Sequence, residues 1–109
     1  MTVAEMRDAL GWKPCVEEGG TDRVVSGCYI GDLLSWVMGR APADSVWITV
    51  MQNANVAAVA MLADVACVLL AENVSPDPDL SARAREKGIS IYSTDRDAFS
   101  LACAIRELL

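Results

Sequence analysis

Hydrophobic and polar positions form repeating blocks in the second half of the chain. The short apolar runs "VWITV", "ACVLLA" and "ISIY" are each followed by a polar turn and then by a helical stretch. Near-continuous apolar runs are typical of strands buried on both faces, and helices between them indicate parallel pairing with right-handed crossovers. We therefore predict an α/β fold, a small three-layer domain with a mainly parallel sheet flanked by helices.

The apolar stretch 56–71 needs a separate decision, because it could also form one buried helix. Its first half is rich in alanine, its second half is rich in valine and leucine, and Asp64 lies between them. We therefore predict a helix that ends near Asp64 and a strand that follows it.

The first residues carry a helix-start pattern. Thr2 and Glu5 have the Thr-x-x-Glu spacing of a capping box, and Gly11 suits the end of a helix. We predict a helix over 3–10. The next segment, "KPCVEEGGTD", reads as a loop with one short strand.

The segment from 23 to 40 predicts one strand and one short helix. "RVVSGCYI" is rich in β-branched and aromatic residues, and Gly27 inside it indicates a bulge or a close backbone approach. "GDLLSWVMG" predicts a helix with Asp32 in its first turn, where a carboxylate favours the helix dipole.

The last two helices also have recognisable ends. Pro78 suits the first position of a helix capped by Asp77, and Gly88 suits its end. We expect the final helix to be capped by Ser93, Thr94 or Asp95. The apolar positions of this helix have helical spacing and predict a buried stripe made of Ala98, Leu101, Ala102, Ile105 and Leu108. Phe99 and Cys103 lie to one side of this stripe.

Composition bounds the class of protein. The chain has 109 residues, of which 53% are hydrophobic, and its net charge is −6. This size and composition favour a single domain that comprises residues 1–109. We expect an N-terminal helix and loop in residues 1–22 and the core in residues 23–109. It has no basic run for nucleic acid and no polybasic or amphipathic membrane patch, so we expect neither partner. No secretory signal is evident, so we expect a cytoplasmic location.

Several chemistries lack their residues. Histidine is absent, the chain has two lysines, and neither a P-loop nor a G-x-G-x-x-G motif is present. The four cysteines are widely spaced, which argues against a zinc site or a disulfide framework. We therefore expect no catalytic residue, no metal ligand and no cofactor.

Buried and exposed side chains can be assigned in part. Cys67 and Cys103 lie in apolar runs and read as small core residues, and Trp47 lies in a strand. Core burial is the favoured interpretation of Trp36, although an exposed Trp36 would suit a protein interface. Because so small and apolar a chain has much apolar surface to cover, we expect a homodimer.

Polar turns follow the three predicted parallel strands. Ligands of open α/β sheets bind beyond the carboxyl ends of the strands, and helix starts there offer free N–H groups. Helix capping alone accounts for the same residue types, so capping and ligand contact remain two interpretations. The candidate ligand-binding residues are Gln52, Asn53, Asn55, Glu72, Asn73, Ser93 and Thr94.

The chain after about residue 24 resembles the DRTGG domain family. The similarity is carried by "GCYIGDLLS", "VWITV", "ACVLLAEN" and "KGISIYST". The motif that names the family is absent as written, and the turn aligned with it is "MQNAN". None of these segments is a catalytic signature.

The resemblance implies a small α/β module with a regulatory role. Such modules accompany HPr kinase/phosphorylase, some phosphotransacetylases and CBS-domain pyrophosphatases. In the pyrophosphatases they look like dimerising parts of an adenine-nucleotide-responsive unit. We therefore expect a non-catalytic regulatory or ligand-binding module that senses an adenine nucleotide or a small metabolite. The alternative is an accessory subunit of a cytoplasmic enzyme or a redox or hydrogenase system, with a partner protein and no ligand of its own.

Overall fold

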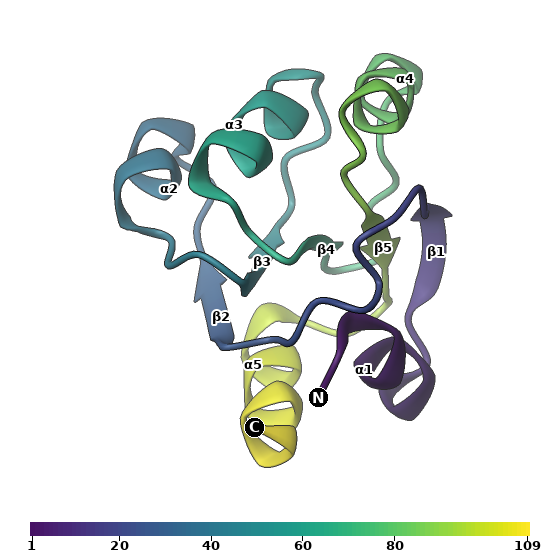
Figure 1. Cartoon of the computed structure of the whole chain (residues 1–109), viewed down its shortest axis with the longest axis vertical. Helices are drawn as coiled ribbons and strands as arrows, with labels where there is room; N and C mark the ends of the chain where they lie inside the picture. Colours follow the sequence, from purple (N-terminus) through teal and green to yellow (C-terminus); the bar gives the residue numbers. More distant parts are fainter.

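The structure, a computed structural model, describes all residues 1–109 and has five strands and five helices. In chain order the elements are α1 (Val3–Leu10), β1 (Lys13–Val16), β2 (Gly27–Ile30), α2 (Leu34–Arg40), β3 (Ser45–Thr49), α3 (Asn55–Ala63), β4 (Cys67–Leu70), α4 (Pro78–Lys87), β5 (Ile91–Ser93) and α5 (Ala98–Leu108) (Figure 1). None of the helices is long and apolar enough to cross a membrane.

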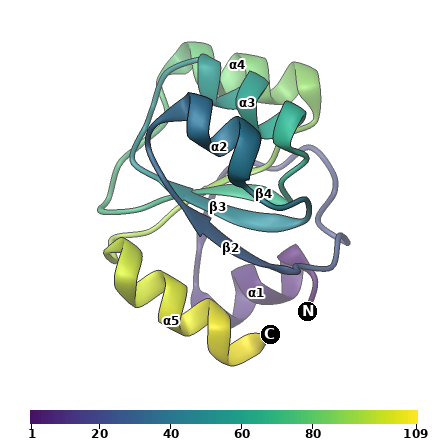
Figure 2. The same cartoon turned by 90° about the vertical axis from the view of Figure 1, so that its left-hand side faces the viewer.

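The sheet has the order β1-β5-β4-β3-β2. Strands β2 to β5 pair in parallel with their sequence neighbours, and β1 joins the far side of β5 in the antiparallel direction. Helices α2, α3 and α4 cover one face and α1 and α5 cover the other (Figure 2). The three-layer α/β fold with a mainly parallel sheet is thus confirmed.

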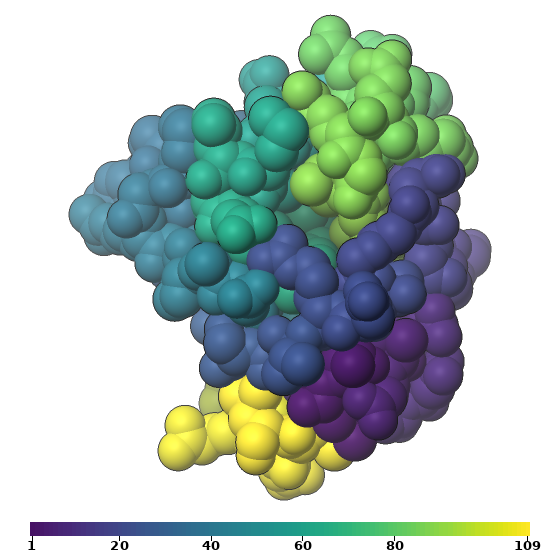
Figure 3. Space-filling view, viewed as in Figure 1, coloured from purple at the N-terminus to yellow at the C-terminus, as the bar shows by residue number.

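Each central strand contributes to two cores, because successive side chains point to opposite faces. Trp47 and Leu70 belong to the cluster under α2, α3 and α4, whereas Ile48, Leu69 and Tyr92 belong to the cluster under α1 and α5. Helices α1 and α5 are in contact with each other and close this second face (Figure 3). The strands are therefore buried on both sides, as their uniform apolar runs predicted.

Most helix ends follow the sequence signals. Thr2 and Glu5 form the capping box of α1, and Gly11 ends this helix in the left-handed region. Asp64 ends α3 in the same conformation, and β4 begins three residues later, so the division of the apolar stretch is confirmed. Pro78 starts α4 and Gly88 ends it, although the Asp77 side chain makes no capping bond.

Two expectations about backbone positions were wrong. Gly27 pairs with Ser45 at the start of a regular β2–β3 register, and the register shift lies instead between Pro14 and Val16 in β1. The cap of α5 is Asp97, whose carboxylate accepts the Ser100 N–H, because the chain needs several more residues after β5 to cross to the other face of the sheet.

Two side chains expected in the core lie at the surface. Trp36 is 52% exposed on α2, and the Arg40 guanidinium lies 3.9 Å from its ring centroid. Cys103 is exposed on α5, on the side away from Leu101 and Ile105. In both cases the helix buries a narrower stripe than its composition suggests. Cys67 and Trp47 are buried as expected.

Arg23 joins distant segments at the amino ends of β3 and β4. Its guanidinium donates to the Asp44 carboxylate and to the carbonyl oxygens of Asp64 and Val65. The carbonyl bonds to Val65 and Asp64 are 3.0 and 2.9 Å long. Arg23 therefore fixes the segment before β2 across the end of the sheet opposite the polar turns.

Candidate functional site

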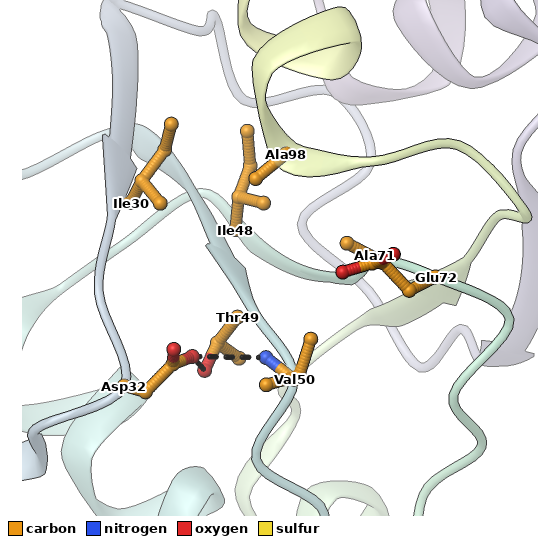
Figure 4. A pocket seen from close by; sticks show the side chains of 8 residues that line it. All are labelled: Ile30, Asp32, Ile48, Thr49, Val50, Ala71, Glu72 and Ala98. Carbon is orange, nitrogen blue, oxygen red and sulfur yellow. Dashed lines mark hydrogen bonds between the residues drawn. The ribbon is translucent and has the colours of Figure 1, made fainter.

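The carboxyl ends of β2, β3 and β4 meet the start of α5 at one edge of the sheet. A cavity of about 150 Å³ opens there. Its wall comes from the ends of the three strands, the residues that follow them, and the first residue of α5 (Figure 4). The lining residues are Ile30, Asp32, Ile48, Thr49, Val50, Ala71, Glu72 and Ala98.

Asp32 lies between β2 and α2 and is held by the end of β3. Its Oδ1 accepts the Thr49 hydroxyl proton at 2.7 Å and the Val50 N–H at 3.0 Å. The expectation that Asp32 lies in the first turn of α2 was wrong, since that helix begins at Leu34 after Leu33, without a side-chain cap. The carboxylate bonds across two loops instead and is thereby positioned at the cavity.

Glu72 lines the cavity from the loop after β4. Its backbone is left-handed, with φ of 59°, and so is that of Asn73, with φ of 61°. Two backbone bonds hold this turn against the last loop, from Glu72 N–H to the Arg96 carbonyl and from Asn73 N–H to the Thr94 carbonyl, at 2.9 and 2.8 Å. Figure 4 shows Asp32 and Glu72 on opposite sides of Thr49 and Val50.

The remaining wall is apolar and is completed by α5. Ile30 and Ile48 come from neighbouring strands, and Ala98 is the first residue of the helix. Asp97 precedes it, and the bond from the Ser100 N–H holds the pKa of the Asp97 carboxyl below its usual range. The positive end of α5 is thus already neutralised by a carboxylate of the chain itself.

The turn after β3 contains three of the predicted ligand residues, and the side chains of two of them bond to other groups of the chain. Gln52 Nε2 donates to the Ser75 carbonyl at 2.7 Å, and Asn53 Oδ1 accepts the Asn55 N–H at 2.9 Å. Asn53 therefore acts as a turn cap just before α3, and Gln52 connects two loops. Neither these two residues nor Asn55 lines the cavity.

The other predicted residues lie at the same edge of the sheet. Ser93 is buried at the end of β5, and Thr94 Oγ1 accepts the Arg96 N–H at 3.3 Å. Glu72 is the one member of the predicted set that lines the cavity. The structure thus brings the three turns together, and the cavity lies to one side of them, toward α5.

The sequence interpretation missed Asp32 and Thr49. A signal existed for both. Thr49 is the polar residue that ends the apolar strand β3, and Asp32 closely follows β2, which joins the three predicted strands in the parallel sheet. The same rule of strand ends applied to β2 would have pointed to Asp32. No group of three or more Cys, Asp or Glu side chains is arranged to hold a metal ion.

Comparison with known proteins assigns the family. The DRTGG domain family matches residues 15–108, so the chain belongs to this family. A similar fold is found in the crystal structure of the CBS and DRTGG domains of the regulatory region of Clostridium perfringens pyrophosphatase, complexed with the activator diadenosine tetraphosphate. The TM-score is 0.74 at 13% identity, over 96% of this chain and 44% of the pyrophosphatase chain. The comparison with curated proteins gives no match.

Proposed function

We propose that the chain is a non-catalytic regulatory module that binds a small molecule in the cavity between Asp32 and Glu72. The observation that carries this proposal is the position of the cavity, at the carboxyl ends of parallel strands, where open α/β sheets bind ligands. Membership of the DRTGG family and the likeness to a regulatory region that holds a nucleotide activator support the regulatory role.

The size of the cavity limits the ligand. An apolar protein cavity of about 150 Å³ holds benzene, and ordinary ligand pockets start at roughly 300 Å³. The space here, about 150 Å³, therefore accepts a small metabolite or one part of a larger ligand. An adenine nucleotide would insert its base or ribose and leave its phosphates in solvent, away from the two carboxylates.

Calorimetry with adenosine, AMP, ATP and a set of small metabolites tests this proposal. We expect heat of binding for at least one of them and a loss of affinity in Asp32→Asn. Absence of heat for every compound at millimolar concentration would contradict it. Glu86→Gln is the control, because Glu86 is an exposed carboxylate on α4, an element that contributes no residue to the cavity.

The proposed module is a homodimer in the cytoplasm and needs no cofactor. Strand β2 is an edge strand that pairs only with β3, so one row of its backbone groups has no partner strand. Exposed apolar side chains also lie near this edge, including Ile30 and Leu33. Light scattering during size-exclusion chromatography should give twice the mass of 11.7 kDa; the mass of one chain at all concentrations would contradict the dimer.

A second candidate function is that of an accessory subunit of a larger enzyme. The specific observation is that α2 exposes Trp36 and Met38, next to the exposed Leu33 that precedes the helix, since tryptophan is enriched at interface hot spots. Trp36→Lys should abolish capture of a stoichiometric partner from the source cells, whereas Phe99→Lys, on α5, should not. Equal capture by both variants would contradict a docking surface on α2.

A further inference from the structure

We infer that the cavity between Asp32 and Glu72 is selective for a small organic cation, a primary ammonium group on an apolar body. This inference rests on the proposed function, because it names the chemical class of the ligand of the same cavity. It follows from the charges, the hydrogen-bonding state and the size of the wall.

The charged side chains that line the cavity are both acidic. Asp32 and Glu72 form none of the ion pairs in the structure, and no basic residue lines the cavity. Two carboxylates that form no ion pair create a negative potential, which attracts a cation and repels an anion. An ammonium ion between them would interact with both.

The polar side chains of the wall offer acceptors rather than donors. The Val50 N–H and the Thr49 hydroxyl proton are both donated to Asp32 Oδ1, and Thr49 Oγ1 also accepts the Met51 N–H. Asp32 Oδ2 takes part in neither bond and keeps its capacity to accept. A ligand that bonds to these side chains therefore has to bring the donors, and an ammonium group brings three.

The start of α5 does not reverse this preference. A free helix N-terminus would favour an anion, but the Asp97 carboxylate accepts the Ser100 N–H and occupies this one. The basic residue of the neighbouring loop is Arg96. Its carbonyl accepts the Glu72 N–H, and its guanidinium makes no ion pair.

The apolar part of the wall sets the shape of the ligand. Ile30, Ile48 and Ala98 lie together on the side of the cavity beyond the two carboxylates (Figure 4). The volume of about 150 Å³ matches a group of about the size of benzene. A branched alkyl chain or a single ring therefore fills the apolar side while its ammonium group faces Asp32 and Glu72.

Three molecules of one shape and different charge provide the test. 3-Methylbutylamine is a cation at pH 7, 3-methylbutanol is neutral, and 3-methylbutanoate is an anion. We expect the amine to shift the backbone amide signals of Val50, Glu72 and Ala98 in ¹H–¹⁵N spectra, to bind more tightly than the alcohol, and to weaken with added salt. The carboxylate should leave these signals unchanged.

Variants assign the effect to the two carboxylates. Asp32→Asn and Glu72→Gln should each weaken amine binding by about fivefold, the upper range for exposed charge pairs, without weakening alcohol binding. Asp32→Asn removes the charge and keeps an acceptor for Thr49 and Val50. Glu72→Gln removes the charge on the opposite side of the cavity. Glu86→Gln removes the same charge elsewhere and should not change amine binding beyond a small screened effect.

The outcomes separate this inference from the function on which it rests. Equal or tighter binding of the alcohol or the carboxylate would overturn the cation preference. Binding of adenosine or AMP to the same amides, with none of the amine, would overturn it and leave the proposed function intact. No shift at these amides with any of the compounds would overturn both.

Discussion

Among single residues, Asp32 has the largest influence on the shape of the candidate site. Its Oδ1 holds the hydroxyl of Thr49 and the N–H of Val50, so one carboxylate sets the loop after β2 against the end of β3. The same side chain leaves its second oxygen for a ligand. The proposed function therefore gives this one group two roles, structural support and ligand contact, and substitution can separate them.

Asp32→Ala should lower the free energy of unfolding by about 1–2 kcal/mol, because the Val50 N–H and the Thr49 hydroxyl lose their acceptor. Asp32→Asn keeps an acceptor oxygen and should lose less than about 1 kcal/mol. Urea unfolding followed by tryptophan fluorescence measures both. Equal free energies of unfolding for the alanine variant and the unchanged protein would contradict a stabilising role of these two hydrogen bonds.

Glu17 and Tyr92 form a polar cluster under α1, away from the cavity. The Tyr92 hydroxyl donates to Glu17 Oε2 at 2.5 Å, and Arg7 pairs with the same carboxylate. The bond from Tyr92, followed by that from Arg7, holds the pKa of Glu17 below its ordinary value of 4.5. Burial, followed by the bond to Glu17, raises the pKa of Tyr92.

The cluster predicts a pH dependence of stability. Because the pKa of Glu17 is lower in the folded chain, its contribution is present above the ordinary value of 4.5 and is lost as pH falls through the folded pKa. Glu17→Gln cannot titrate, so the advantage of the unchanged protein over this variant should be constant near pH 7 and shrink below pH 4.5. A difference in unfolding free energy that is the same at pH 3 and pH 7 would contradict this assignment.

At the scale of elements, loop contacts decide how strands pass into helices. The turn after β3 is closed by Asn53, whose side chain accepts the Asn55 N–H, and Gln52 connects it to the loop that leads to α4. The turn after β4 uses two left-handed residues and bonds to the loop after β5. The three turns thus form one continuous rim.

Asn53→Ala should lower the free energy of unfolding by about 1 kcal/mol, as expected for loss of a cap, and should leave ligand affinity unchanged. Thermal melts and calorimetry on the same preparation check the two parts. A loss of affinity at unchanged stability would make Asn53 a ligand contact and would move the site from the cavity to the turn.

The elements could be predicted from the sequence where the signal was local. The capping box at Thr2 and the division at Asp64 depend on a few neighbouring residues, and both are confirmed. Asp32 was misassigned because "GDLL" is also a good helix start, and only the tertiary contact with Thr49 decides between the two. The cap at Asp97 was missed because Ser93, Thr94 and Asp95 are also good capping residues, and the path of the chain across the sheet selects Asp97 instead.

For the whole molecule, the order of the strands places the site. Because β2 to β5 run in parallel, their carboxyl ends gather at one edge, and α5 crosses that edge on its way to the opposite face. The buried apolar runs made this edge predictable. The cavity itself was not, because it depends on where α5 packs, and Ala98 of α5 is 26 to 68 residues away in the sequence from the other residues that line the cavity.

Substitution of Arg23 tests the contacts at the amino ends of β3 and β4, at the end of the sheet opposite the cavity. Arg23→Ala should lower the free energy of unfolding by about 2 kcal/mol, since a charge-assisted bond to Asp44 and two bonds to carbonyl oxygens are lost together. Ligand affinity should not change, because these contacts lie at the amino ends of the strands. Arg83→Ala, on the exposed side of α4, is the matched control in a denaturant titration. Equal stability of the two variants would contradict the role of Arg23.

A ¹H–¹⁵N titration with a set of small polar molecules tests most directly the claim that ligands bind between Asp32, Glu72 and α5. The account predicts that the amide signals of Val50, Glu72 and Ala98 move together with at least one compound, and that Asp32→Asn weakens this response. Shifts confined to the turn from Gln52 to Asn55 or to α2, with the cavity signals unchanged throughout, would contradict it.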